Sequence, residues 1–286
     1  QLFERITVDN QAPLNFLLVK AATTVLGSAE WAVRSVTAAS GIALVLLAYD
    51  VARRLLSRDA ARWVAILLAT SPMAIHYSQE ARPYALLMLL VLAGFRIARS
   101  FDARPTCARG LGLVAVLLAT SLAHNVGPFY AAGLDVAFVS SRRPDAHHLR
   151  SWGAILAATA VGYLVWLPNL LQQTTGMAHS FAWASGIWGS EFPFQIPRSW
   201  AAMTHGSLAP IRNRVPDIMW QAWVALGLSL LIWIGSFHRR SRLADPRLPV
   251  LLLLGGATPL IGMWIYSIVS SPPIYLVGRV DSPALP

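Results

Sequence analysis

Two apolar runs, residues 63–75 and 85–95, are separated by the polar segment His76-Tyr77-Ser78-Gln79-Glu80-Ala81-Arg82-Pro83-Tyr84. Each run supplies most of a membrane helix, because about 20 apolar residues cross the ~30 Å hydrocarbon core of a bilayer. A charge in the middle of such a helix costs about 2.5–3.5 kcal/mol. We therefore expect Glu80 and Arg82 to lie at a membrane–water boundary, between two helices.

The composition extends this expectation to the whole chain. Of its 286 residues, 56% are hydrophobic and only 13% are charged, whereas a soluble domain carries about 25% charged residues. The apolar runs are continuous rather than alternating, which is typical of helices and not of strands. The fold class predicted is all-α, a polytopic transmembrane helical bundle. About eight spans are expected, near residues 36–56, 60–75, 84–100, 110–126, 127–141, 152–171, 217–237 and 248–268.

The basic residues indicate how this bundle is oriented. The net charge is +10, but most arginines fall in alternate short loops, within residues 53–62, 96–109, 142–150 and 239–247. Short loops rich in Lys and Arg remain on the cytoplasmic side. The positive charge is thus explained by topology, and we expect no nucleic-acid partner. The segment 76–84 falls on the opposite, outer face.

We expect one transmembrane domain over residues 1–286, incomplete at both ends because the chain starts at Gln1 and stops at Pro286 after a polar segment. Its expected parts are an outer loop with an interfacial helix, a six-helix core, an outer loop, two helices and an outer tail (residues 1–35, 36–171, 172–216, 217–268 and 269–286). The aromatic side chains of the 172–216 loop suit a segment lying on the bilayer, or stacking on a sugar or lipid.

Three residues of the polar segment, Glu80, Arg82 and Tyr84, are candidates for binding. His76, Glu80 and Tyr84 are spaced by four residues, so a continuous helix would bring them near one face. Arg82 is the type of side chain that holds a phosphate in a two-pronged contact. The alternative is a simple interfacial ion pair between Glu80 and Arg82, worth about 0–1 kcal/mol.

Three further candidates fall on the same outer face. Asp9 precedes Pro13, which is suited to open a helix; taken alone, Asp9 is better explained as a solvated loop residue. His124 lies at the outer end of a helix, where a histidine is often structural. Arg279 is a second phosphate-binding candidate, or an interfacial anchor.

Taken in order, several elements form a recognisable series: Asp9 with Pro13-Leu14, residues 26–34, Ser71-Pro72, residues 77–86, His124 and Arg279. Through them the chain resembles the bacterial branch of the dolichyl-phosphate-mannose–protein mannosyltransferase-like superfamily. These are membrane glycosyltransferases of the GT-C fold, close to family 39 and to the aminoarabinose and rhizobial core-sugar transferases. Residues 77–86 are the most specific part of the resemblance.

The resemblance implies transfer of a sugar, with inversion, from a polyprenyl-phosphate donor to a lipid, glycan or protein acceptor at the outer face of the bacterial inner membrane. It places the general base in an Asp-Glu pair upstream of Gln1, so no residue here is expected to be the catalytic base. Two departures stand out. Gln11-Ala12 replaces the family's His-Pro pair before Pro13, and Val280 replaces the aromatic residue after Arg279.

These considerations give an expected substrate-binding set of Asp9, Glu80, Arg82, Tyr84, His124 and Arg279. Arg82 and Arg279 would stabilise charge on the leaving lipid phosphate. Asp9 and Glu80 would bind sugar hydroxyls, orient the arginines or, with His124, hold a possible divalent cation. The rival hypotheses are a transporter or flippase, since intramembrane charges and broken helices mark such folds, and a non-catalytic homologue of the family.

Overall fold

The computed structural model describes residues 12–141, 145–180 and 245–269, with isolated positions at 199, 227, 231, 234, 235 and 274. These residues form helices, and no strand occurs among them, which confirms the predicted all-α class. In chain order the helices are α2 (Pro13–Leu26), α3 (Glu30–Leu55), α4 (Arg58–Thr70), α5 (Pro72–Gln79), α6 (Tyr84–Ala103), α7 (Cys107–Ala123), α8 (Gly127–Ser140), α9 (Ala146–Tyr163), α10 (Leu167–Ser180) and α14 (Leu248–Val269).

Three of these helices, α3, α6 and α14, are long and apolar enough to cross a membrane, and α9 with α10 forms a further candidate bent by 63°. Each span predicted within the described ranges coincides with a helix or a helix pair. The span predicted near 60–75 is two helices, α4 and α5, separated at Ser71. The span predicted near 217–237 lies outside the part of the chain that the structure describes.

Local sequence signals set the helix starts. The hydroxyl of Ser71 accepts a hydrogen bond from the backbone N–H of Ala74 at 3.4 Å, and Pro72 occupies the first turn of α5. The carboxylate of Asp145 caps α9 by accepting from the N–H of His148 at 2.7 Å. Side-chain oxygens at the N-cap satisfy N–H groups that have no partner within the helix. The predicted helix opening at Pro13 is confirmed by α2.

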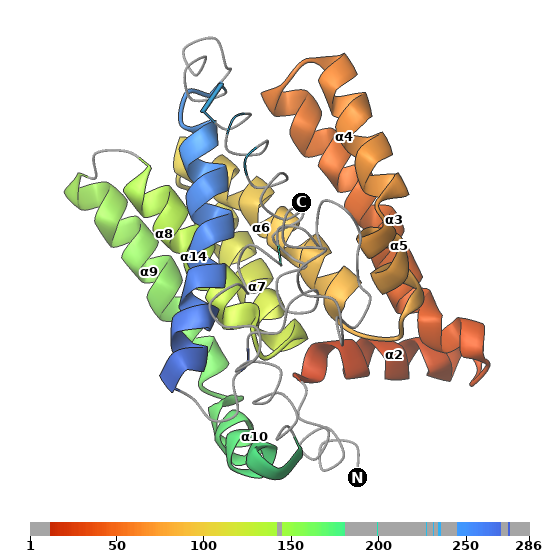
Figure 1. Cartoon of the computed structure of the whole chain (residues 1–286). Coiled ribbons are helices and arrows are strands. Elements are labelled where there is room, and N and C mark those ends of the chain that lie inside the picture. Colours follow the sequence, from red (N-terminus) through yellow and green to blue (C-terminus); the bar gives the residue numbers. More distant parts are fainter. Residues whose placement is uncertain are drawn as a thin grey trace.

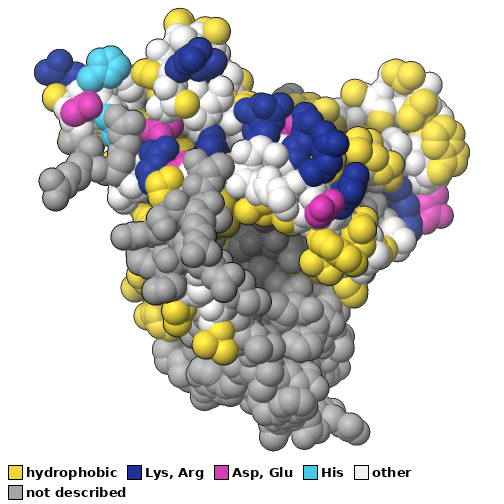
Figure 2. Space-filling model, turned by 90° about the horizontal axis from the view of Figure 1, so that it is seen from above, with side chains coloured by type: hydrophobic (Ala, Val, Ile, Leu, Met, Phe, Trp, Pro, Cys, Tyr) yellow, Lys and Arg dark blue, Asp and Glu magenta, His cyan; other side chains and the backbone are white. Residues whose placement is uncertain are grey.

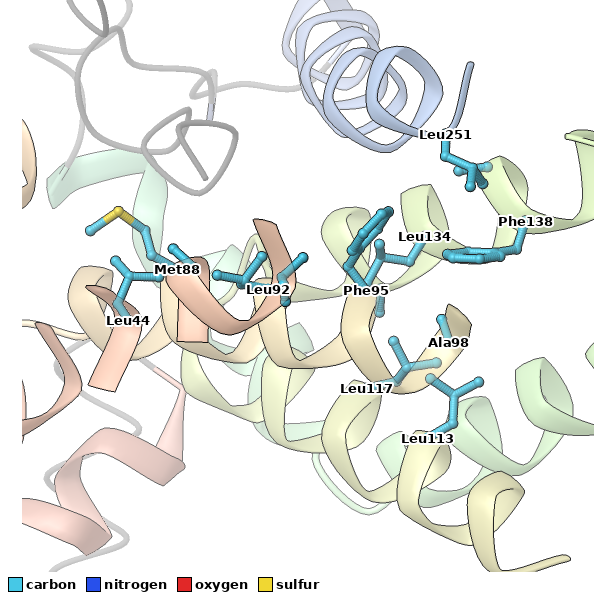
Figure 3. Packing of buried hydrophobic residues seen from close by; sticks show 14 of the residues in the cluster. Leu44, Met88, Leu92, Phe95, Ala98, Leu113, Leu117, Leu134, Phe138 and Leu251 are labelled. Atoms are coloured by element: carbon cyan, nitrogen blue, oxygen red, sulfur yellow. The ribbon is translucent and has the colours of Figure 1, made fainter. Parts of the chain in front are cut away.

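Helix α6 is the centre of the bundle (Figure 1). Figure 3 shows Met88, Leu92 and Phe95 along its length, with Leu44 of α3 beside Met88 and Leu117 of α7 below. All of them are buried in one apolar cluster. Between helices in a lipid environment, close van der Waals packing of this kind supplies the association energy. Helix α6 therefore fixes the position of the turn that precedes its first residue, Tyr84.

One end of the bundle gathers the arginine-rich turns. Figure 2 looks down on this end and shows its Lys and Arg side chains with Asp and Glu among them. The Arg247 guanidinium lies 2.9 Å from Asp102, and that of Arg99 lies 3.1 Å from Asp245, so ion pairs tie the end of α6 to the start of α14. His148 of α9 lies 3.6 Å from the same Asp102. These pairs agree with the predicted alternation, which places all four arginine-rich loops on one side.

The other end holds α2, which lies crosswise beneath the start of α3, and the turn between α5 and α6 (Figure 1). Two predicted boundaries are wrong at this end. Helix α3 begins at Glu30 rather than near residue 36, and α10 continues to Ser180, inside the predicted 172–216 loop. The remainder of that loop lies outside the described residues.

Candidate functional site

The turn between α5 and α6 contains the charged residues that the sequence singled out. Helix α5 ends at Gln79, where the N–H of Glu80 closes the last turn by donating to the carbonyl of His76 at 3.1 Å. The N–H of Arg82 then donates to the Glu80 carbonyl at 2.8 Å, and Pro83 caps α6. Since the helix stops at Glu80, the expectation that His76, Glu80 and Tyr84 share one helical face is wrong for Tyr84.

An open pocket lies against this turn. Its volume is about 390 Å³, within the ~300–1,000 Å³ that small-molecule sites occupy. Its lining comes from two separate parts of the chain: Arg34 from the second turn of α3, and the end of α5 with its following turn, namely His76, Gln79, Glu80, Ala81 and Arg82. The pocket thus brings two guanidinium groups, a carboxylate, an amide and an imidazole to one place.

Arg34 and Glu80 each lie close to a side chain four residues earlier in the chain. Glu30 contacts Arg34 at 2.5 Å, and the Nε2 atom of His76 lies 3.8 Å from the Glu80 carboxylate. The interfacial pair considered between Glu80 and Arg82 is not what the structure contains, because the partner of Glu80 is His76. Arg82 also lines the pocket and is exposed, and it forms no ion pair with any residue that the structure describes.

Aromatic rings pack together next to the turn between α5 and α6. Tyr84 is buried, with 7% of its surface exposed, and its ring centroid lies 4.6 Å from that of Tyr77 and 5.3 Å from that of His124. The ring of His76 meets the edge of Tyr77 at 5.2 Å. Such contacts are worth about 0.5–1.5 kcal/mol each beyond the area they bury. Tyr84 is therefore part of the aromatic packing at the start of α6, rather than an exposed surface for binding.

His124 joins this aromatic cluster from the segment between α7 and α8. Its Nδ1 atom accepts a hydrogen bond from the N–H of Val126 at 3.2 Å, which leaves the ring proton of the neutral form on Nε2. Burial, together with the positive charge of Arg82, lowers the pKa of His124 to about 4. At neutral pH the ring is therefore uncharged, and it packs against Tyr84 without adding a third positive charge near Arg82.

Helix α3 holds α5 in place through a close contact. A Cβ atom at Gly41 would lie 2.1 Å from the hydroxyl of Ser78 and 2.8 Å from its Cβ atom. The Ser78 hydroxyl in turn donates to the carbonyl of Ala74 at 2.6 Å. Since Ser78 is two residues before Glu80, the absence of a side chain at Gly41 sets how closely the pocket end of α5 approaches α3.

The structure brings together Glu80, Arg82, Tyr84 and His124, four of the six predicted site residues. Asp9 and Arg279 lie outside the described residues. Within the residues that are described, no three His, Cys, Asp or Glu side chains come together as metal ligands. The described part of the pocket therefore does not by itself fit a divalent cation, and we assign no step to one.

Sequence reasoning missed Arg34 and Gln79 as pocket residues. A signal for Arg34 was present in the charge pattern, since it is an arginine at the start of a span on the arginine-poor side. Gln79 carries no comparable signal, because a glutamine at a helix end is common on any surface.

Comparison with known proteins gives one finding. A sequence model of the family described as dolichyl-phosphate-mannose-protein mannosyltransferase matches residues 10–171. This region contains α2 to α9, the start of α10 and the whole pocket lining. No curated protein and no solved structure matches the chain.

Proposed function

Because the chain belongs to the dolichyl-phosphate-mannose-protein mannosyltransferase family, whose model covers more than half of it, we propose that it transfers a sugar from a polyprenyl-phosphate donor to a lipid, glycan or protein acceptor. The proposal places this inverting reaction at the extracytoplasmic face of the bacterial inner membrane. The observation that carries it is the pocket at the arginine-poor end of the bundle, where Arg82 and Glu80 lie side by side on one turn.

The chemistry of the leaving group matches this pocket. When the bond between the sugar and the phosphate breaks, negative charge develops on the polyprenyl phosphate that departs. A guanidinium aimed at that position stabilises the charge as it appears, and such preorganised groups contribute about 2.7–4 kcal/mol each in other enzymes. Arg82 suits this role because it is exposed to the pocket and forms no ion pair among the described residues.

The other side of the pocket suits a sugar. Glu80 accepts hydrogen bonds from hydroxyl groups, and Gln79 both donates and accepts them. The Nε2 atom of His76 lies 3.8 Å from the carboxylate of Glu80. The proposal assigns no residue of this chain as the general base. It gives Glu80 the role of binding and orienting the donor.

The orientation of the bundle supports the choice of face. The turns with many arginines lie at one end of the bundle, and the turn between α5 and α6, which lines the pocket, lies at the other (Figure 1). By the positive-inside rule, the end with the arginines faces the cytoplasm. A polyprenyl phosphate whose head group is on the outer leaflet would meet the pocket there, with its apolar tail between the helices.

A donor panel tests the proposal. The full-length protein is incubated in liposomes with polyprenyl-phosphate derivatives of several radiolabelled sugars, and the lipid and acceptor products are separated by chromatography. We expect one donor to be consumed, and we expect Glu80→Gln and Arg82→Ala to abolish the transfer while membrane insertion stays intact. The matched control is Arg62→Ala, which removes an exposed arginine at the opposite end.

The same experiment separates the rival hypotheses. A flippase moves a lipid-linked sugar between leaflets without changing it, so the donor would become accessible on the other side with its glycosidic bond intact. A non-catalytic homologue would leave every donor both unmoved and uncleaved. Either outcome with the full-length protein, or wild-type rates in both pocket variants, contradicts the proposal.

A further inference from the structure

The pocket contains a second arginine that comes from a different helix. Arg34 lies in the second turn of α3, whereas Arg82 lies on the turn after α5, and both side chains line the same pocket. Contact between α3 and α5 at Gly41 and Ser78 holds these two elements together. The two guanidinium groups therefore face one space from two sides, a juxtaposition that sequence spacing does not reveal.

Two like charges in one pocket repel each other unless an anion lies between or beside them. Here the compensation is partial. Glu30 is one helical turn before Arg34 and contacts it at 2.5 Å, but no described carboxylate pairs with Arg82. Guanidinium groups present parallel N–H donors that match the oxygens of a phosphate group, which makes a pair of them a better phosphate site than an isolated ammonium.

We propose that Arg34 and Arg82 bind the phosphate of the polyprenyl carrier together, and that Glu30 holds Arg34 at the pocket until a phosphate oxygen replaces the Glu30 carboxylate. This inference rests on the proposed function and names the residues that recognise the carrier. It assigns Arg34 a binding role and Glu30 a positioning role. The exchange is physically inexpensive, because the side chains of both residues are half exposed or more and an exposed ion pair contributes only about 0–1 kcal/mol.

The inference makes opposite predictions for the two members of the Glu30–Arg34 pair. If the pair only stabilised the start of α3, then Glu30→Gln and Arg34→Ala would have similar effects. If Glu30 competes with phosphate for Arg34, then Arg34→Ala weakens phosphate binding and Glu30→Gln strengthens it. Arg34→Lys keeps the charge without the planar fork, so it is expected to fall between Arg34→Ala and the wild type.

The test is calorimetric titration of the full-length protein in detergent with farnesyl phosphate, a short polyprenyl phosphate that resembles the released carrier. Farnesol and inorganic phosphate are the two controls. We expect Arg34→Ala to weaken binding about tenfold, the low end for a charge-assisted contact at a half-exposed group. We expect Glu30→Gln to tighten binding by up to about fivefold.

Arg62→Ala is the matched control, because Arg62 is also an exposed arginine paired with an acidic residue on its own helix, Asp59 at 2.9 Å. It should bind farnesyl phosphate as the wild type does. Thermal unfolding of each variant shows whether the fold is retained. If the control weakens binding as much as Arg34→Ala does, the site assignment is overturned.

The outcomes separate the sources of the phosphate. Equal affinity for farnesyl phosphate and inorganic phosphate would point to a free anion and overturn the assignment to a lipid carrier. Competition by phosphatidylglycerol in nanodiscs, equal to that by farnesyl phosphate, would point to a general lipid head-group site and overturn it as well. Equal effects of Glu30→Gln and Arg34→Ala would refute the exchange.

The inference and the proposed function can fail separately. Binding that depends on Arg34 without any sugar transfer would leave the inference standing and remove the proposed function. If the wild type transfers sugar but Arg34→Ala binds the carrier as tightly as the wild type, the proposed function stands and the inference about Arg34 fails.

Discussion

Gly41→Ala tests whether the contact between α3 and α5 positions the pocket. The new Cβ atom would lie 2.8 Å from the Cβ atom of Ser78, whereas non-bonded carbons pack at about 3.5–4.0 Å. The two helices must therefore separate by roughly 0.7 Å or more at this point. Rotating the Ser78 hydroxyl away does not relieve the contact between the two Cβ atoms, and it breaks the 2.6 Å hydrogen bond to Ala74.

The expected cost in stability is modest. Overpacking of this size costs about 1–3 kcal/mol, and replacing glycine by alanine inside a helix returns up to about 1 kcal/mol. Gly112→Ala is the matched control, because a Cβ atom there meets nothing within 4 Å. The difference in unfolding free energy between the two variants isolates the overpacking, and we expect about 1–3 kcal/mol.

The expected cost in function is larger, since a displacement near 1 Å reduces the rate of a positioned reaction by up to about a hundredfold. We expect Gly41→Ala to lower sugar transfer at least tenfold while Gly112→Ala leaves it unchanged. Adding Ser78→Gly removes the atoms that clash and should restore most of the activity. If Gly41→Ala matches Gly112→Ala in both stability and transfer, the contact does not position the pocket.

Three further predictions concern other parts of the molecule. Asp102→Ala should lower the free energy of unfolding by about 1.5–3 kcal/mol, because it removes a buried carboxylate bonded to a guanidinium. Asp59→Ala, which removes an exposed ion pair, should lower it by at most about 1 kcal/mol. Similar thermal unfolding of the two variants would contradict this difference. In a Cys107→Ser background, a membrane-impermeant maleimide should label the Ala81→Cys variant from outside intact cells. Native Cys107, which is exposed near the arginine-rich end, should react only after the cells are permeabilised. The reverse pattern of labelling would contradict the proposed orientation. The pKa of His124 is about 4 in the folded protein and 6.5 ordinarily, so between these values the unfolded chain binds more protons, and the stability contributed by the neutral ring is complete above about pH 6.5 and lost towards pH 4. Lowering the pH from 7 to 5 should therefore lower the unfolding midpoint of the wild type more than that of His124→Gln. Equal changes in the two midpoints would refute the assignment.

Much of the fold could be predicted from the sequence because its signals are local. Apolar runs predicted the helices, and Pro13 predicted the start of α2. The division of predicted span 60–75 into α4 and α5 shows the limit of hydropathy alone. The Ser71-Pro72 pair interrupts the helix while the residues around it remain apolar, so the run looks continuous to a hydropathy average.

The site was less predictable because its geometry is tertiary. The position of Tyr84 depends on the chain reversal at Pro83, which turns its ring inward against Tyr77 and His124. Spacing along a single imagined helix cannot anticipate that reversal. Arg34 and Arg82 line the same pocket where α3 packs closely against α5 at Gly41, and no feature of the sequence near Arg34 records this packing.

The same limit applies at the arginine-rich end. The alternation of charge assigned Arg99 and Arg247 to the cytoplasmic side, and the structure adds that they form ion pairs with Asp245 and Asp102. The partners Arg247 and Asp102 are 145 residues apart. Sequence reasoning therefore predicted a side of the membrane for these arginines but not the ion pairs that they form.

The central claim is that the pocket at the arginine-poor end transfers sugar from a polyprenyl-phosphate donor. The most direct measurement is the initial rate of labelled sugar transfer in right-side-out vesicles that hold the full-length protein, with the donor supplied only to the outer leaflet. We predict transfer by the wild type and by Arg62→Ala, and at least a hundredfold loss in Arg82→Ala, in line with removal of one charge-stabilising group. Equal rates in Arg82→Ala and Arg62→Ala, or transfer only when the donor is on the inner leaflet, would contradict the account.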